Sequence, residues 1–455
     1  MRTKEQAIAA VDRPWGAWPI VRPVRAYRPW ILGAIYAVAL LPPTLAPKLG
    51  GNVLSRYMTI EAIVERGELA IERSPLLARS GSPDVVRFGS RLYSDKPPVL
   101  PVLASPIYAG LHAAGVRFSG RGLQFAEANL VLTWGVVGLA SAWTLVGIRR
   151  LLQAVPIAPG MADLLTLGFG FGSPLLTYAV TFNNHSVAAA LIAAALGRTL
   201  LEPPGKGAGR IRFAAGLLGA LAATIDLPAG GVILAGLAIV QAIRARSIPW
   251  AFLLGAAGPL LLHGWLQSKV TGSPLPAEMY PESFLFPGSY WATPEGTWKE
   301  RGPRVWFGLG LLAGPQGWLT VTPVLIFGLI GLAMVIARPA DPLRPSAWMV
   351  LGSLLVLLAY YTWGVRRTDF GGSSFGTRHL LPMTPPCLVF AAVALGRLRG
   401  LVAPSVFVLL AGIGFVYAFA GMKDPWSRIE KRARTEPALR VIQRLVPFHA
   451  EPPPR

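Results

Sequence analysis

The sequence predicts an all-α polytopic membrane protein, and three observations support this fold class. Of the 455 residues, 53% are hydrophobic and 14% are charged, whereas an ordinary soluble domain has roughly 25% charged residues. Long apolar runs recur along the chain and are separated by short basic clusters. The single cysteine, Cys387, excludes a disulfide framework and a thiolate metal site. Soluble globular enzymes and disordered chains are therefore excluded.

The net charge of +21 is spread over these clusters and forms no single patch or RNA-binding motif. Lys and Arg in this arrangement are typical of the cytoplasmic loops of membrane proteins, where they also meet anionic lipid headgroups. Nucleic acid is therefore not an expected partner.

The elements follow in chain order. Residues 1–28 are rich in Arg and aromatics, which predicts a cytoplasmic segment at the membrane interface. Residues 29–421 form the predicted transmembrane domain, and 422–455 form a basic C-terminal tail. Runs long enough to cross a core of ~30 Å total about 11. They lie at 30–46, 124–148, 162–181, 185–200, 211–225, 228–243, 250–267, 317–337, 346–363, 380–396 and 403–421.

The run 97–115 is also apolar, but four prolines interrupt it. If this run does not cross the membrane, every basic cluster between spans falls in a cytoplasmic loop, and if it crosses, they all move outside. The positive-inside rule therefore predicts an in-plane or re-entrant helix here. The same topology places the C-terminus outside, so the basic tail departs from the rule.

Three polar outer loops remain, at 47–123, 268–316 and 364–379. The first is expected to contain an amphipathic in-plane helix over 57–72, whose glutamates face solvent. Further along this loop, Pro97 and Pro98 predict a helix start that Asp95 can cap. A helix N-terminus beside Lys96 is an anion site suited to a lipid phosphate. The alternative is that Asp95 is only a cap and Lys96 only extends to the membrane surface.

The segment Tyr93-Ser94-Asp95-Lys96-Pro97-Pro98 resembles the lysine–diproline signature of the GT-C membrane glycosyltransferases. These include the aminoarabinose transferases of lipid A and, more distantly, the protein O-mannosyltransferases. Three later segments are similar to the same family in the same order, and the resemblance covers about residues 30 to 400. These segments are Phe182-Asn183-Asn184-His185, Gly314-Pro315-Gln316-Gly317-Trp318 and Gly372-Ser373-Ser374-Phe375-Gly376-Thr377-Arg378-His379.

The resemblance implies a polyprenyl-phosphate-sugar donor and an inverting transfer to a hydroxyl of an envelope glycan, lipid or protein. It also implies an active site on the outer face of a bacterial inner membrane. Such a transfer needs a carboxylate to take the acceptor proton and positive charge to stabilise the departing phosphate.

The candidate catalytic carboxylates are Asp84 and Asp95, and Asp84 is preferred because it follows Ser82-Pro83 and is not the expected cap. The candidate ligands of the donor phosphate share an outer-face position and a cationic or hydrogen-bonding side chain. They are Lys96, His185, Arg378 and His379, and the candidate substrate contacts are Tyr93, Asn184 and Tyr290.

Each of these residues has a simpler interpretation. His185 can be a satisfied interfacial residue, Arg378 can meet a lipid headgroup from a flexible turn, and Tyr290 can belong to an interfacial aromatic belt. Asp226 either ends a span or lines the site. The sequence requires no cofactor. A divalent cation, Mg²⁺ or Mn²⁺, held by carboxylates and lipid phosphate stays open.

One departure from the family affects the function. Its members commonly have an acidic residue just after the first span, but residues 50–56 contain none. A catalytically inactive envelope scaffold is therefore one alternative. A lipid-linked sugar flippase is another, although neither an internal repeat nor charged residues deep within the spans are evident.

Overall fold

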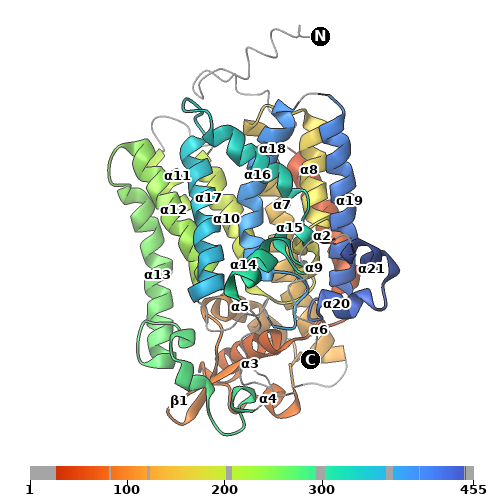
Figure 1. Cartoon of the computed structure of the whole chain (residues 1–455). Coiled ribbons are helices and arrows are strands. Elements are labelled where there is room, and N and C mark those ends of the chain that lie inside the picture. Colours follow the sequence, from red (N-terminus) through yellow and green to blue (C-terminus); the bar gives the residue numbers. More distant parts are fainter. Residues whose placement is uncertain are drawn as a thin grey trace.

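The apolar runs of the sequence fold into helices that stand side by side (Figure 1). The computed structural model describes residues 27–80, 84–119, 123–200, 208–293, 303–364, 372–398, 400–444 and 446. Most of the interfacial segment expected over 1–28, and Ser82-Pro83, lie outside the described residues. Apart from the two strands of one hairpin, the described elements are helical, which confirms the all-α class.

Most helices of the bundle occupy the positions of the predicted spans, but the helix Arg304–Ala313 lies within the predicted outer loop 268–316, because residues 305–313 form a short apolar run. The helices of the bundle are α2 (Arg28–Thr44), α6 (Leu123–Leu132) with its continuation η2 (Thr133–Gly138) and α7 (Leu139–Leu151), α8 (Pro159–Phe171), α9 (Pro174–Ala179), α10 (Asn184–Leu200), α11 (Ala208–Ile225), α12 (Leu227–Ala245), α13 (Trp250–Thr271), α14 (Arg304–Ala313), α15 (Trp318–Val321), α16 (Leu325–Ile336), α17 (Arg344–Ala359) with η7 (Tyr360–Gly364), η8 (Arg378–Met383) with α18 (Thr384–Arg397), and α19 (Val402–Lys423).

Six described helices are long and apolar enough to cross a membrane. A seventh span would be the pair formed by 304–321 and α16, which is bent by 105°. The total of about 11 spans stays a prediction, because α2 and α10, with 17 residues each, are shorter than any of these six helices.

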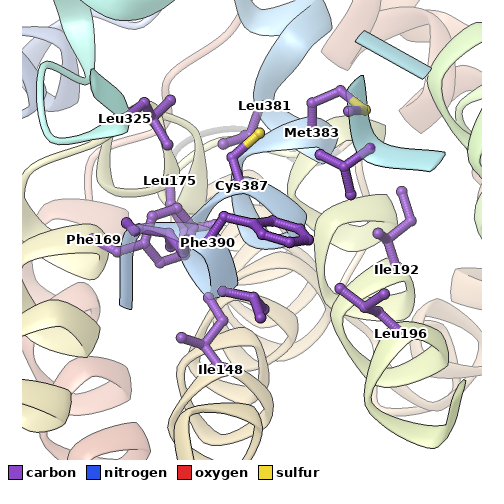
Figure 2. Packing of buried hydrophobic residues seen from close by; sticks show 14 of the residues in the cluster. Ile148, Phe169, Leu175, Ile192, Leu196, Leu325, Leu381, Met383, Cys387 and Phe390 are labelled. Carbon is purple, nitrogen blue, oxygen red and sulfur yellow. The ribbon is translucent and has the colours of Figure 1, made fainter. Parts of the chain in front are cut away.

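The core is centred on α18. Buried residues account for 89% of the apolar stretch of α18 but for 22% of that of α19, which lies at the edge of the bundle. Figure 2 shows Cys387 and Phe390 of α18 among apolar side chains from α7, α8, α9, α10 and α16. Helices on every side of α18 therefore contribute to one continuous core.

Basic residues expected in cytoplasmic loops meet at one end of the bundle. Asp163, at the start of α8, pairs with Arg149 at the end of α7 (2.5 Å) and with Arg28 at the start of α2. Asp341 pairs with Arg397 at the end of α18 (2.5 Å). These ion pairs connect the ends of neighbouring helices on the same side of the molecule.

The first outer loop forms a separate packed layer at the other end of the bundle (Figure 1). It contains α3 (Gly51–Arg66), α4 (Pro75–Ser80), β1 (Val85–Phe88), β2 (Arg91–Ser94) and α5 (Val99–Ala113). The second loop adds the short turns η4 (Ala277–Met279), η5 (Pro281–Phe284) and η6 (Tyr290–Ala292). Helix α5 packs against α3, and both lie beside the lower ends of the bundle helices.

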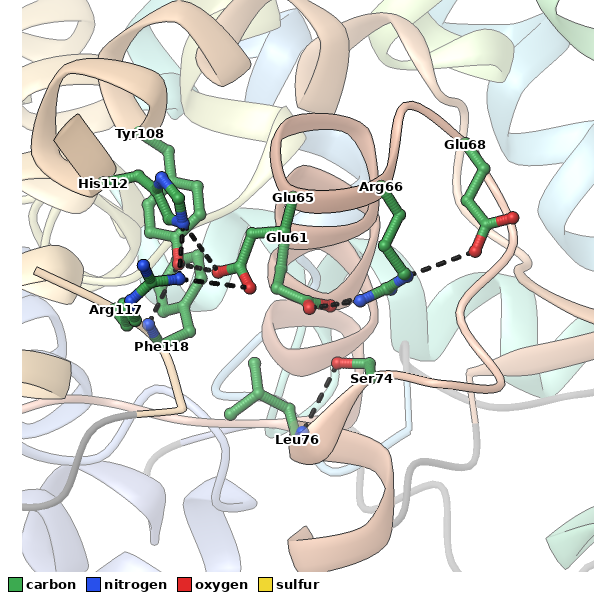
Figure 3. A network of polar contacts seen from close by, with 10 residues as sticks. All are labelled: Glu61, Glu65, Arg66, Glu68, Ser74, Leu76, Tyr108, His112, Arg117 and Phe118. Atoms are coloured by element: carbon green, nitrogen blue, oxygen red, sulfur yellow. Dashed lines mark hydrogen bonds and ion pairs between the residues drawn. The ribbon is translucent and has the colours of Figure 1, made fainter. Parts of the chain in front are cut away.

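Helix α3 differs from the amphipathic helix expected over 57–72. It ends at Arg66 because Gly67 adopts a left-handed conformation (φ 70°) that terminates the helix. Its glutamates do not all face solvent either, since Glu61 is 1% exposed and its Oε2 accepts a hydrogen bond from Arg66 at 3.0 Å. Figure 3 shows this pair and Glu65, which accepts from the Tyr108 hydroxyl of α5 at 2.7 Å. Polar contacts therefore fix α3 within the layer.

The C-terminal segment also packs onto the protein. Helices α20 (Ile429–Ala433) and α21 (Pro437–Gln443) lie beside the lower half of α19 (Figure 1). The Gln443 amide donates to the Pro315 carbonyl (3.1 Å) and to the Tyr417 hydroxyl (2.9 Å). The segment after α19 thus lies at the same end as the outer loops, as the predicted topology requires.

Candidate functional site

The hairpin of β1 and β2 places two carboxylates opposite each other. Val85 pairs with Ser94 at the open end of the hairpin, so Asp84 and Asp95 are the next residues on the two strands. The Asp95 amide donates to the Asp84 carbonyl at 3.4 Å. Two residues far apart in the loop sequence are thereby held side by side.

Lys96 lies between these carboxylates. Its Nζ is 2.8 Å from Asp95 Oδ2 and 3.1 Å from Asp84 Oδ1. The expectation that Asp95 caps a helix starting at Pro97 is wrong, because α5 begins at Val99 and no side chain caps it. The Asp95 carboxylate is therefore available for other chemistry, and Lys96 points into the protein.

The electrostatics of this group follow from its burial. Asp95 is 5% exposed, and burial, assisted by the nearby Asp84, raises the pKa of its carboxyl to about 6 against the opposing charge of Lys96. Burial alone would lower the pKa of Lys96, but the two carboxylates outweigh it and raise that pKa. Asp95 Oδ1 is buried without a hydrogen-bond partner. A buried acceptor atom without a partner can accept a hydrogen bond from a ligand.

Arg56 of α3 adds a cation that the sequence analysis did not identify. It is 2% exposed, and its guanidinium donates to the Asn52 carbonyl (2.8 Å) and to Asn184 Oδ1 (2.7 Å). Burial lowers its pKa to about 10, with a further contribution from Arg378, so it stays charged at neutral pH. The charges of Asp84, Asp95 and Asp226 also act on it. Arg56 thus occupies the segment 50–56, where the family commonly has an acid.

A second buried pair comes from α10 and the start of α12. His185 Nδ1 lies 2.6 Å from Asp226 Oδ2, and both side chains are buried. The ring of His379 meets His185 edge-on at 5.4 Å and stacks on Tyr361 at 4.9 Å. Within the part of the chain that the structure describes, no hydrogen bond of His185 Nε2 is found, which leaves this atom for a ligand.

Arg378 begins the turn η8. Its guanidinium lies 5.2 Å from the ring centroid of Trp426, a cation–π contact, and its Nε is buried without a partner. The Trp426 indole in turn donates to the Lys48 carbonyl at 3.0 Å. The C-terminal segment therefore supports the position of Arg378.

Glu278 in η4 is a further group near Asp95. Its side chain reaches solvent, but the surrounding protein raises the pKa of its carboxyl to about 7, and the charge of Asp95 contributes to the rise. No sequence motif marks Glu278, because it lies in the second loop and comes near Asp95 of the first loop only in the folded chain.

The predicted site residues thus fall into two groups. The structure brings together Asp84, Asp95, Lys96, Asn184, His185, Arg378 and His379, and adds Arg56, Asp226 and Glu278. We call these ten residues the charged cluster. Tyr93 packs instead in an apolar cluster with Val86 and Ala277. Tyr290 is 45% exposed and lies against Trp291.

The charged cluster contains no preformed set of metal ligands among the described residues. The described ranges contain no group of three or more His, Cys, Asp or Glu side chains that could hold one. Between Asp84 and Asp95, the position that a divalent cation could share is taken by the Lys96 ammonium.

Solved structures of proteins from two organisms are similar to this chain. The apo oligosaccharyltransferase of Archaeoglobus fulgidus is 13% identical to this chain, with a TM-score of 0.48. The match covers 94% of this chain but only 61% of the length of that protein. A complex of the archaeal oligosaccharyltransferase AglB from Archaeoglobus fulgidus with an inhibitory peptide and a dolichol-phosphate gives a TM-score of 0.49 at 13% identity, over 94% of this chain and 61% of that one. ArnT from Cupriavidus metallidurans bound to undecaprenyl phosphate is 16% identical with a TM-score of 0.47, over 93% of this chain and 75% of that one.

No family model matches the sequence, and a search of curated proteins finds no match. Because the identities to the solved structures are low and the TM-scores lie below 0.5, the activity has to be inferred from the residues of this chain.

Proposed function

We propose that this protein is a membrane glycosyltransferase that moves a sugar from a polyprenyl-phosphate donor to a hydroxyl acceptor. The observation that carries the proposal is the charged cluster, a buried group of cations and carboxylates at one end of an apolar helical bundle. Lys96, Arg56 and Arg378 can bind phosphate oxygens there. In a polyprenyl phosphate, the phosphate lies at the membrane edge and would reach the charged cluster, while the polyprenyl chain would lie along the apolar helices.

The chemistry of transfer assigns the roles. The acceptor oxygen attacks the anomeric carbon while the bond from that carbon to the phosphate oxygen breaks, and its electron pair stays on the phosphate. The cations of the charged cluster stabilise the charge that develops on this oxygen. The acceptor proton needs a base, and a carboxylate with a pKa near the working pH is suited to this step.

Asp95 is our first candidate for that base, and Asp84 is the second. Burial raises the pKa of Asp95 to about 6, and its Oδ1 has no partner. Asp84 instead keeps Lys96 in position through its 3.1 Å contact. His185, His379 and Asn184 are proposed to contact the donor around its phosphate. Tyr93 and Tyr290, which lie outside the charged cluster, are proposed to contact parts of the substrate away from the reacting atoms.

Charge asymmetry supports a location. The ion-paired basic ends of the helices lie opposite the charged cluster, and basic loops are cytoplasmic by the positive-inside rule. We therefore place the site on the outer face of a bacterial inner membrane, where the acceptor would be an envelope glycan, lipid or protein.

The test is transfer of radiolabelled sugar from a panel of polyprenyl-phosphate sugars to membrane acceptors by the purified protein in proteoliposomes. We expect Lys96→Gln to lower kcat/KM by about 100-fold or more, because it removes a cation from the leaving phosphate. Asp95→Asn should do the same if it removes the base. Lys269→Gln is the matched control, since Lys269 lies exposed on α13, and it should leave the rate unchanged.

Two results would overturn the proposal. Movement of lipid-linked sugar across the vesicle membrane without transfer would identify a flippase. An inactive scaffold would be favoured if the protein neither transferred nor moved sugar with any donor. The wild type and Lys96→Gln would both have to unfold at the same temperature, which shows that the protein is folded.

A further inference from the structure

A groove of about 800 Å³ runs between α12 and α17. Its lining runs from Val232 to Ile243 on α12 and from Arg344 to Val356 on α17, so it covers most of the length of both helices. Asp226 of the charged cluster precedes the first residue of α12, and Tyr361, which stacks on His379, lies two residues beyond the end of α17. The end of the groove at Ile243 and Arg344 is therefore the end that lies away from the charged cluster.

The walls of the groove are almost entirely apolar. Its lining includes Ile239, Ile243, Trp348 and Val356, each of which is at least half exposed (Trp348 51%). Its volume lies within the ~300–1,000 Å³ typical of small-molecule sites. An apolar groove at membrane depth is suited to a hydrocarbon chain.

The end of the groove carries an uncompensated positive charge. Arg344 lines it and uses Nε to donate to the Ile336 carbonyl at 3.2 Å, while its two terminal amino groups have no partner among the described residues. The one acidic residue of the lining, Asp341, is already paired with Arg397 at 2.5 Å. The exposed Arg338 adds further charge nearby. An anionic group is therefore favoured at this end.

The length of the groove corresponds to one leaflet. From Arg344 to Val356, twelve helical steps of ~1.5 Å cover about 18 Å, compared with ~15 Å for half of the hydrocarbon core. A chain seated along α17 would thus begin at the headgroup level and end near the middle of the bilayer.

We propose that this groove binds an acidic phospholipid, with an acyl chain between α12 and α17 and its phosphate on Arg344. The lipid comes from the leaflet on the side of the basic loops, which is the cytoplasmic, anionic leaflet. This site is separate from the charged cluster and does not depend on the proposed transferase activity.

The test uses the full chain in nanodiscs of zwitterionic lipid that contain a small fraction of brominated phosphatidylglycerol or brominated phosphatidylcholine. Bromine quenches nearby tryptophans, and the difference between the wild type and Trp348→Phe reports the groove. We expect quenching at Trp348 to need about fivefold less phosphatidylglycerol than phosphatidylcholine, as one cation near the headgroups would give. Arg344→Gln should abolish this preference.

Glycines provide a matched pair of variants that alter the groove and a lipid-facing surface elsewhere. A side chain added at Gly352, which lines the groove, meets open space, so Gly352→Leu fills the groove without moving a helix. Gly412 on the exposed α19 is equally open, so Gly412→Leu is the control. We expect Gly352→Leu, but not Gly412→Leu, to abolish the quenching difference at unchanged thermal stability.

Equal quenching by both lipids in the wild type would overturn the proposal, since it would indicate only the surrounding bilayer. A preference for phosphatidylglycerol that survives both Arg344→Gln and Gly352→Leu would overturn it as well, because the lipid would then bind elsewhere.

Discussion

At the scale of single residues, the ionisation of Asp95 determines when the proposed reaction can run. Its pKa of about 6 results from burial, and only the ionised form can accept a proton. The charge of Asp84 also raises this pKa. The pH dependence of the rate therefore identifies which carboxylate is the base.

We expect kcat/KM to fall as the pH decreases through about 6, reaching about a tenth of its plateau one unit lower. Asp84→Asn should move this limb to lower pH, because it removes the neighbouring charge that raises the pKa of Asp95. Rates of the wild type and of Asp84→Asn, measured between pH 4.5 and 8, check this. A limb at about pH 6 that persists in an active Asp95→Asn variant would rule out Asp95 as the base.

Lys96 and Asp95 could be predicted as site residues from the sequence, because both lie in one short motif. Gly89-Ser90 between two β-prone runs is a local hairpin signal, and this hairpin brings Asp84 beside Asp95. Arg56 could not be placed, because its partner Asn184 lies 128 positions away. Such contacts exist only after the helices have packed.

At the scale of elements, α3 is held by a buried ion pair. Glu61 is 1% exposed while Arg66 partly reaches solvent. We expect Arg66→Met to lower the free energy of unfolding by about 3 kcal/mol, because it leaves the buried Glu61 charge without a partner. Thermal unfolding in detergent measures this loss. Adding Glu61→Gln should restore part of the stability, and no recovery in the double variant would mean that Arg66 acts through packing alone.

Helices α11 and α13 approach closely enough that only glycine fits between them. A Cβ on Gly255 would overlap the carbonyl group of Phe213, and one on Gly216 would overlap that of Phe252. We expect Gly255→Val to lower the unfolding temperature in detergent by several degrees, because overpacking costs about 1–3 kcal/mol. Gly258→Val on the same helix meets open space and should have little effect. If Gly255→Val and Gly258→Val lowered the unfolding temperature equally, the effect would be one of helix propensity and not of overpacking.

Element boundaries show where prediction from sequence failed. The helix expected over 57–72 lies over 51–66, because the glycine that terminates it, Gly67, was read as part of the helix. The amphipathic pattern of α3 and the apolar run of α5 could be predicted from the sequence, but the packing of these two helices against each other could not, because an in-plane helix and a helix in a packed layer have the same amphipathic pattern.

At the scale of the whole molecule, the side of each loop can be tested with one cysteine at a time. The native Cys387 is fully buried and should not react with a membrane-impermeant maleimide. We expect Ser90→Cys in the hairpin turn and Thr435→Cys in the C-terminal segment to be labelled in intact cells, and Ser247→Cys between α12 and α13 to be labelled only after lysis. All three positions are exposed. Labelling of Ser247→Cys in intact cells would invert the topology.

The all-α polytopic class could be predicted because apolar runs and basic clusters are encoded locally, and a helix stands at each expected span. The number of crossings could not be fixed in the same way. Helices α8 and α9 share the predicted span 162–181, and α14 to α16 meet at a bend of 105°. Whether such pieces cross together depends on packing that the hydropathy of the chain does not encode.

Trp426 makes the assembly of the site depend on the end of the chain. Its indole joins Lys48, near the beginning of the chain, to Thr181, and it supports Arg378. A nascent chain on the ribosome can insert every earlier helix and still lack this connection. The site would therefore be assembled only once the segment beyond the final membrane helix has been translated, so that a prematurely terminated chain would sit in the membrane without a finished site.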